Sequence, residues 1–224
     1  MKKTAKILMT EFVTHDVKRF IIEKPKNYSF IPGQAVDLSI NKPHWKNETR
    51  PFTFTSLNED LVLEFTIKGY PERQCVTDQL HKLKPGDDVI LGEPFGTINY
   101  KGPGVFIAAG AGITPFIAIL RRLRRDNQLS GNSLIFSNKT SEDIILEKEF
   151  KDIFRGNEQN LIFTLTREKK EGYDYGRIDE RFLKEKIENF SQNFYICGPD
   201  SFVKDIKKTL KNLGAKVSSI VFEK

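Results

Sequence analysis

Side chains that hold metals and clusters are scarce in this sequence of 224 residues. It contains two cysteines, Cys75 and Cys197, which form no CxxC pair, and three scattered histidines without an HExxH spacing. Structural zinc sites and protein-bound iron–sulfur clusters usually take about four ligands of the Cys or His type. The sequence therefore predicts no metal site, and it excludes a disulfide-stapled miniprotein.

Long hydrophobic runs are also lacking. Apolar residues 7–9 follow the N-terminal lysines, but this stretch is too short for an export signal, and charged residues follow from Glu11 onward. The uncharged segment 105–120 is interrupted by Gly110, Gly112 and Pro115, which suits a buried strand, turn and helix better than a membrane span. We therefore expect a cytoplasmic protein without membrane insertion, because the cysteines are also unpaired.

The excess of positive charge is modest, and it is not gathered in one stretch. The chain has 36 Lys and Arg against 30 Asp and Glu, a formal net charge of +6. The one dense basic run, at 121–125, falls at the end of an expected helix, where cations interact favourably with the helix dipole. We expect no nucleic-acid binding, and the charge is compatible with an acidic protein partner.

The first half of the sequence has the rhythm of short strands. Stretches rich in Val, Ile, Phe and Thr are separated by turns containing Pro, Gly or Asn. This spacing is typical of an antiparallel barrel or sandwich, and we expect a Greek-key β-barrel over residues 1–101. The expected strands are 6–13, 18–23, 35–40, 52–55, 61–68 and 88–91, with one short helix at 77–83.

The second half alternates between strands and helices. Gly102, Pro103 and Gly104 mark the join. Alternation of this kind predicts a parallel sheet with helices on both faces, so residues 102–224 should form a doubly wound α/β domain. The expected strands are 105–109, 133–137, 161–166, 194–197 and 217–222, and the expected helices are 116–125, 142–154, 179–190 and 201–213.

A glycine-rich turn follows the first strand of this α/β half. Gly110 and Gly112 allow a ligand to approach the backbone closely, Thr114 suits a helix N-cap, and Pro115 suits the first helical position. The free amides of the new helix would then face a phosphate group. The pattern is neither the GxGxxG fingerprint, because Pro115 replaces the third glycine, nor a Walker loop. On this segment alone, a diphosphate site and an ordinary structural turn remain equally open.

A second glycine turn, at Gly198 and Pro199, follows the fourth expected strand of this half. Open α/β sheets bind ligands outside the carboxyl ends of their strands, so both turns should border one crevice. Cys197 would lie at the rim of that crevice. The alternative is a buried and inert cysteine, which is the commoner fate of this residue.

The first half carries the segment RPFTFTS at residues 50–56. Arg50 can bind a phosphate, Phe52 can lie on a flat ring, and Thr53 can form a hydrogen bond with a ring nitrogen. On this segment alone, an ordinary barrel strand remains the more common explanation.

Taken together and in order, these motifs resemble the ferredoxin–NADP reductase superfamily over essentially the whole chain. Each motif is common singly, but seven of them in register are specific. The family pairs an N-terminal FAD-binding barrel with a C-terminal NAD(P)-binding α/β domain. The matching segments are FIPGQ at 30–34, RPFTFTS at 50–56, TIK at 66–68, QCVT at 74–77, GEPFG at 92–96, GAGITP at 110–115 and CGPD at 197–200.

The resemblance implies a role for each matching residue. Arg50 would bind the flavin diphosphate, Phe52 would stack on the isoalloxazine and Thr53 would approach its N5 atom. Cys197 would lie near C4 of the nicotinamide, and Glu223 stands where some relatives place an acidic or aromatic residue near the flavin. The implied catalytic residues are thus Thr53, Cys197 and Glu223. The implied FAD site comprises Arg50, Pro51, Phe52, Thr53, Ile67, Lys68, Cys75, Val76, Thr77 and Phe222. The implied NAD(P) site comprises Gly110, Gly112, Ile113, Thr114, Pro115, Asn138, Arg167, Cys197, Gly198, Pro199 and Asp200.

The function implied is hydride transfer from NAD(P)H to FAD, followed by single-electron transfer to a separate acidic carrier such as ferredoxin or flavodoxin. Two cysteines are too few for a fused ferredoxin cluster. Gln74 stands where the family usually has Gly, so a free-flavin reductase that binds flavin as a dissociable substrate is the alternative. A nucleotide-binding regulatory subunit is the non-enzymatic alternative.

The identity of the nicotinamide nucleotide is open in the sequence. Arg167, Lys169 and Lys170 resemble the stretch that reads the 2′-phosphate in relatives that use NADPH, and cations suit that dianion. The segment SNKT at 137–140, which includes Asn138, resembles instead the NADH-using cytochrome b5 reductases. The balance slightly favours NADPH, and the oligomeric state is not indicated.

Overall fold

The computed structural model describes residues 2–73, 75–96 and 98–222. The chain divides into two compact units, the first formed by Met1–Gly96 with Thr114–Arg122 and the second by Thr97–Ile113 with Leu123–Lys224. No helix among the described residues is both long and apolar enough to cross a membrane.

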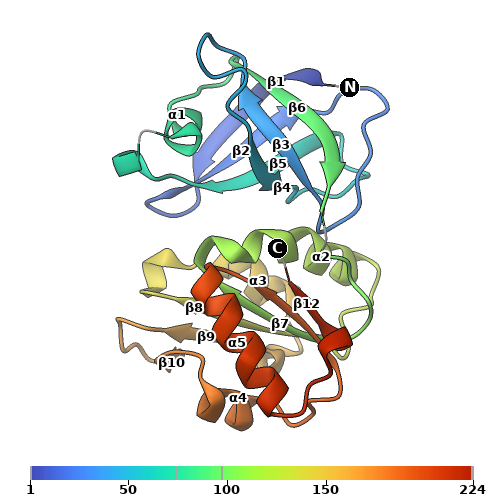
Figure 1. The fold of residues 1–224 in the computed structure, drawn as a ribbon, viewed down its shortest axis with the longest axis vertical. Helices are drawn as coiled ribbons and strands as arrows, with labels where there is room; N and C mark the ends of the chain where they lie inside the picture. Colours follow the sequence, from blue (N-terminus) through green and yellow to red (C-terminus); the bar gives the residue numbers. More distant parts are fainter. Residues whose placement is uncertain (1, 74, 97, 223–224) are drawn as a thin grey trace. The chain divides into compact units, whose positions relative to one another are not determined.

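The first unit contains an antiparallel sheet of six strands (Figure 1). Its order is β4-β3-β6-β1-β2-β5, and a bridge between Phe54 and Phe65 joins the two outer strands, so the sheet closes into a barrel. With that bridge, β3, β4 and β5 are successive neighbours and β6 returns beside β3, which is the Greek-key arrangement. The predicted barrel is therefore confirmed. The strands are β1 (Lys3–Phe12), β2 (Val17–Glu23), β3 (Ala35–Ile40), β4 (Arg50–Thr53), β5 (Val62–Lys68) and β6 (Asp88–Phe95).

Alternating apolar residues fill the interior of this barrel. Phe54 is fully buried, stacks on Phe30 with ring centroids 4.1 Å apart, and lies 5.1 Å from the centroid of Phe65. The segment after β4 is also held by polar bonds, because Thr55 Oγ1 donates to Glu64 Oε1 at 2.8 Å. These contacts fix the end of β4, where several candidate site residues lie.

A short helix, α1 (Val76–His81), connects β5 to β6 after the 3₁₀ turn η1 (Pro71–Arg73). It starts one residue before the predicted helix and ends two residues earlier. Val76 and Leu80 lie on its buried face and belong to the barrel core. Burial of these two side chains anchors the helix to the barrel.

The second unit contains a parallel sheet with the order β10-β9-β8-β7-β11-β12 among the described strands (Figure 1). Chain order runs outward from β7 in both directions, as in a doubly wound fold. The strands are β7 (Gly104–Ala109), β8 (Ser133–Asn138), β9 (Leu161–Leu165), β10 (Asp174–Tyr175), β11 (Asn193–Cys197) and β12 (Ile220–Phe222). The helices of this unit are α3 (Glu147–Ile153), α4 (Glu180–Lys186) and α5 (Asp200–Asn212), whereas α2 (Thr114–Arg125) lies mostly in the first unit, which includes residues 114–122.

Helices cover both faces of the parallel sheet because its strands are apolar on both sides. Val105 and Ile107 point to one face, where they join the core cluster that includes Ile206 of α5. On the opposite face, Phe136 of β8 meets Phe150 of α3, with ring centroids 6.1 Å apart. The predicted parallel α/β arrangement is confirmed.

The structure differs from the sequence prediction at several element ends. The single helix expected at 142–154 is instead the 3₁₀ turn η3 (Ser141–Asp143) followed by α3, because Leu146 takes a left-handed conformation with φ of 54°. The helix expected at 179–190 ends at Lys186. The two-residue strand β10 was not predicted, since two residues carry no periodic pattern. The last predicted strand begins as the 3₁₀ turn η5 (Val217–Ser219).

Candidate functional site

The strands β7 and β11 end side by side in the second unit. Ala108 lies opposite Cys197, and on the other side of β7, Ala109 lies opposite Ser137. The chain leaves β7 toward β8 on one side, and β11 lies on the other, so this is the switch point of the sheet. Ligands bind open α/β sheets at the carboxyl ends of such strands. Both glycine turns lie at this edge.

Gly112 packs against the turn that follows β11. A Cβ atom at Gly112 would lie 2.4 Å from the carbonyl oxygen of Cys197 and 2.5 Å from the amide nitrogen of Gly198, far inside any normal contact. Gly110 differs, since it has a φ of 52° and nothing within 4 Å of the position of its Cβ. The two glycines therefore serve different needs, close backbone approach at Gly112 and a left-handed conformation at Gly110.

The predicted capping role of Thr114 is wrong. The chain enters the 3₁₀ turn η2 (Gly110–Ile113) directly after β7, and Thr114 is the first residue of α2 in one continuous helical run. The left-handed Gly110 allows the chain to turn at once, so the helical segment starts four residues before the expected cap. Pro115 is the second residue of α2, and Ile113 is fully buried.

Asn138, at the end of β8, is a buried amide whose side chain has no partner among the described residues. The residue is 5% exposed, and neither Nδ2 nor Oδ1 forms a hydrogen bond with a described residue. Leaving such a group unsatisfied costs about 1–3 kcal/mol. Its backbone carbonyl, in contrast, accepts a bond of 2.9 Å from the amide of Thr166. The side chain thus fits a site for a polar ligand at the same sheet edge.

The loops after β8 and β9 are tied together near this amide. The amide of Arg167 donates to the carbonyl of Lys139 at 2.9 Å, and the amide of Ser141 donates to Glu168 Oε2 at 2.6 Å. That bond from Ser141 holds the pKa of Glu168 below its usual range. Lys170 Nζ also donates to Ser141 Oγ, at 2.9 Å. Arg167 itself is exposed and can meet an anion, although the charge of Glu168 lies beside it in sequence.

Cys197 is the last residue of β11, and it is 6% exposed. Gly198 follows with an extended backbone, Pro199 forms the N-cap of α5, and Asp200 is the first residue of that helix. The structure thus places these four residues in the turn beside Gly112. A role of Cys197 in hydride transfer stays a prediction.

Phe222 lies half-buried at the end of β12, with Lys207 Nζ 3.2 Å from its ring centroid. It borders a hollow of about 630 Å³ along α5. Glu223, the residue implied to be catalytic beside it, lies outside the described residues, as does Gln74. The hollow is lined by Gly198, Asp200, Val203, Lys204, Lys207, Lys208, Lys211 and Phe222.

The strand β4 carries the RPFT residues in the first unit. Phe52 packs against the barrel core and Thr53 is half-buried, whereas Arg50 is exposed and donates from Nη1 to the carbonyl of Thr49 at 2.7 Å. Pro51 is exposed, and it is tolerated because β4 pairs along its length only with β3. Arg50 and Phe52 alternate with Pro51, so they lie on the same side of the strand.

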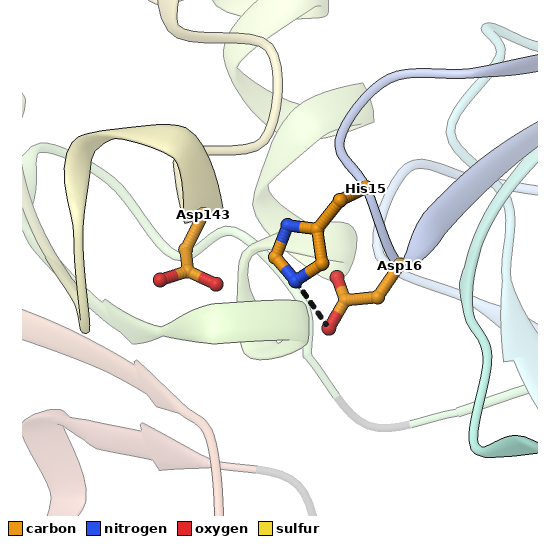
Figure 2. Close-up of side chains that lie close together, drawn as sticks. All are labelled: His15, Asp16 and Asp143. Atoms are coloured by element: carbon orange, nitrogen blue, oxygen red, sulfur yellow. Dashed lines mark ion pairs between the residues drawn. The ribbon is translucent and has the colours of Figure 1, made fainter.

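At the end of β5, Ile67 is buried and Lys68 pairs with Asp16, Nζ to Oδ2, at 2.6 Å. Burial alone would raise the pKa of Asp16, but the hydrogen bond and charge of Lys68 outweigh it and hold that pKa below its usual range. Figure 2 shows His15 beside Asp16, with His15 Nε2 3.6 Å from Asp16 Oδ2. Only the backbone of Lys68 is therefore available to a ligand without breaking an ion pair. The sequence carried no signal for Asp16.

The segment before α1 holds a paired thiol. Cys75 Sγ lies 2.9 Å from Thr77 Oγ1, and this hydrogen bond holds the pKa of Cys75 below its usual value. The hydroxyl of Thr77, a residue of the implied FAD site, is thus engaged with Cys75 in this structure. Val76 is 1% exposed, so it can offer only backbone atoms to a ligand.

Comparisons with known families cover both units. Residues 4–100 match the model of the oxidoreductase FAD-binding domain, and residues 106–208 match that of the oxidoreductase NAD-binding domain. These two matches account for most of the chain.

Individual relatives are distant in sequence. The reductase component of the naphthalene 1,2-dioxygenase system of Pseudomonas putida is 23% identical over 93% of this chain, which spans 64% of its length. NADH-cytochrome b5 reductase 1 of Aspergillus oryzae is 27% identical over 90% of this chain and 75% of its own length.

Solved structures share the fold. The FAD/NAD-binding domain of a nitric oxide dioxygenase from Vibrio cholerae superposes with a TM-score of 0.87 at 22% identity, covering 99% of this chain and 97% of that one. A ferredoxin NADP+ reductase from Neisseria gonorrhoeae, solved with FAD and NADP, has a TM-score of 0.84 at 21% identity, covering 99% and 98%.

Proposed function

We propose that this chain, an NAD(P)H-dependent flavoprotein reductase of the ferredoxin reductase-like superfamily, passes single electrons to a separate protein acceptor such as a ferredoxin or a flavodoxin. Residues 1–101 would bind FAD, and residues 102–224 would bind the nicotinamide nucleotide. The buried, unpartnered amide of Asn138 beside the paired glycine turns is the observation that carries the nucleotide site.

The nucleotide site is proposed at the carboxyl edge of β7, β8 and β11. Gly110, Gly112 and the start of the helical run after β7 would hold the diphosphate, because backbone amides at such a start attract anions. The buried side-chain amide of Asn138 would form its hydrogen bonds with the nucleotide. Cys197 would lie beside the nicotinamide, where its small side chain leaves room for the ring.

The flavin site is proposed along β4 and the end of β5. Bound FAD would accept two electrons as a hydride and release them one at a time. Arg50 would bind its diphosphate as a charged donor, Phe52 would stack on the ring and Thr53 would offer its hydroxyl to N5. The backbone groups of Ile67 and Lys68 would contact the ring. Cys75 and Thr77 would hold the diphosphate, with Val76 contributing backbone atoms only.

NADPH is the proposed electron donor. Arg167 is exposed two residues after the end of β9, with Lys169 and Lys170 close behind it in sequence, and cations of this kind suit the 2′-phosphate. The comparison of kcat/KM for NADPH and NADH tests this choice directly. Equal values, or a preference for NADH, would refute it.

An acidic partner is proposed because α5 presents a row of lysines. Lys204, Lys208 and Lys211 are exposed and pair with no acidic side chain among the described residues, and Lys207 lies between them on the same face. Like charges at these spacings repel one another, so the row favours an external negative surface. It is about 10 Å long, which suits several carboxylates of a protein better than one small anion.

An anaerobic absorption spectrum tests the whole assignment. We expect purified protein to carry FAD and to lose its flavin colour when NADPH is added. Colourless protein that reduces added flavin with saturation kinetics would favour the free-flavin reductase. A flavin that no nicotinamide nucleotide can bleach would favour the regulatory subunit instead.

The Arg50→Ala variant tests the flavin assignment separately. Among the described residues, exposed Arg50 forms a hydrogen bond only with the neighbouring carbonyl of Thr49, so its loss should leave the barrel folded. FAD retention after gel filtration should fall sharply. Retention equal to that of the unmodified protein would contradict the role of Arg50.

A further inference from the structure

His81, the last residue of α1, reaches back to the end of β5. Its Nε2 lies 2.8 Å from the carbonyl oxygen of Ile67, a residue proposed to contact the flavin ring. Because a carbonyl can only accept, this bond requires the proton to be on Nε2. The ring thereby joins the end of α1 to the end of β5.

The imidazole also packs against the backbone beyond Lys68. A Cβ atom at Gly69 would lie 2.7 Å from His81 Nδ1 and 2.8 Å from His81 Cε1. The imidazole ring therefore occupies the space that a side chain at position 69 would need. Gly69 is held from the other side, since its amide donates to the carbonyl of Asp16 at 2.8 Å. The position of Gly69 is therefore set jointly by His81 and by the β1–β2 turn.

The backbone of His81 is fixed by a buried lysine. Lys18 is 8% exposed, and its Nζ donates to the carbonyl oxygens of His81, at 3.0 Å, and Leu83, at 3.2 Å. The rings of Phe12 and Phe20 lie edge-on to the imidazole, with centroids about 6 Å away. These neighbours leave the side chain few alternative orientations.

We infer that His81 is a positioning residue for the flavin, a role that rests on the proposed FAD site. The helix α1 starts in the segment 75–77, proposed to hold the diphosphate, and β5 ends at Ile67 and Lys68, proposed to contact the ring. The hydrogen bond from His81 Nε2 to the Ile67 carbonyl holds these two parts of the site at a set distance. The barrel then has to lose less conformational freedom when flavin binds, and the affinity for flavin is higher for that reason.

Two substitutions separate the hydrogen bond from the packing. His81→Phe keeps an aromatic ring between Phe12 and Phe20 but removes the donor, whereas His81→Gln restores an amide donor near the position of Nε2. His44→Asn is the matched control, because His44 is an exposed histidine with a φ of 69°, a conformation that Asn tolerates. The dissociation constant for FAD is measured on protein stripped of flavin, and ferricyanide serves as the small-molecule acceptor in activity assays.

We expect His81→Phe to weaken FAD binding about tenfold, which equals about 1.4 kcal/mol. His81→Gln should recover most of that affinity, and KM for NADPH should be unchanged in both variants. The visible circular dichroism of bound FAD should change in His81→Phe and return in His81→Gln. A merely structural role would lower thermal stability without changing that spectrum.

The inference is overturned if His81→Phe binds FAD as tightly as His44→Asn, or if His81→Gln is as weak as His81→Phe. Should His81→Phe fail to fold, nitrogen NMR of the unmodified protein decides, because the Nδ1–H tautomer would rule out the bond to Ile67. Failure of the proposed function looks different, since the unmodified protein itself would then bind no FAD.

Discussion

Replacing Gly112 by alanine should damage the nucleotide site far more than the same change at Gly110. The added Cβ would lie 2.4 Å from the carbonyl oxygen of Cys197, whereas ordinary contacts begin at 3.4 Å, so something must move by about 1 Å. Backbone of β11 is on one side and η2 on the other, and neither can rotate away as a side chain can. Overpacking of this kind costs about 1–3 kcal/mol.

The same substitution at Gly110 provides the control. Nothing lies within 4 Å of its Cβ position, so the cost comes only from the φ of 52°. A non-glycine residue in that left-handed region costs about 1–2 kcal/mol and moves no neighbour. The two variants can therefore lose similar stability while differing in the geometry of the site.

Urea unfolding and steady-state kinetics together test this reasoning. We expect Gly112→Ala to raise KM for NADPH about tenfold or more, which corresponds to about 1.4 kcal/mol of lost binding. Gly110→Ala should change KM much less, and FAD binding should be unaffected in both variants. Equal KM values for the two variants would refute the claim that the turns after β7 and β11 form one site through close backbone contact.

Three further results are expected. Cys197→Ala should slow reduction of the flavin by NADPH in stopped-flow experiments more than it weakens NADPH binding, and a reduction rate equal to that of the unmodified protein would contradict its place beside the nicotinamide. Burial holds the pKa of His81 below its usual value. The charge of Lys18 adds to this effect, and the Ile67 carbonyl, Asp16 and Asp78 oppose it. The unfolded chain therefore binds a proton at His81 at a higher pH than the folded protein does. The free energy of unfolding should therefore decrease as the pH is lowered from 6.5 toward the native pKa, and a slope unchanged in His81→Gln would contradict this. Charge reversal of Lys204, Lys208 and Lys211 should raise KM for an acidic protein acceptor at low salt and leave the reduction of a small uncharged acceptor unchanged. An equal loss with both acceptors would refute the docking role of α5.

Local patterns in the sequence were enough to predict the architecture. Strand spacing and Pro or Gly turns depend on neighbours within a few residues, and they correctly separated an antiparallel barrel from a parallel α/β sheet. The glycine turn after β7 was visible for the same reason, because a strand, two glycines and a Thr-Pro pair stand next to one another. The ends of helices were predicted less accurately. The left-handed Leu146 breaks the helix expected at 142–154, and no local pattern in the sequence marks that break.

Tertiary contacts alone decided how these pieces serve the site. Gly112 must be glycine because of the carbonyl of Cys197, and the side-chain amide of Asn138 has no hydrogen-bond partner among the described residues. In the sequence His81 is one of three scattered histidines, and only the fold places its ring against the carbonyl of Ile67. Each of these depends on residues far apart in the chain, and their distances are set by the packing of strands and helices. Composition and local spacing carry no information about that packing, so the sequence determined the elements and the fold determined their contacts.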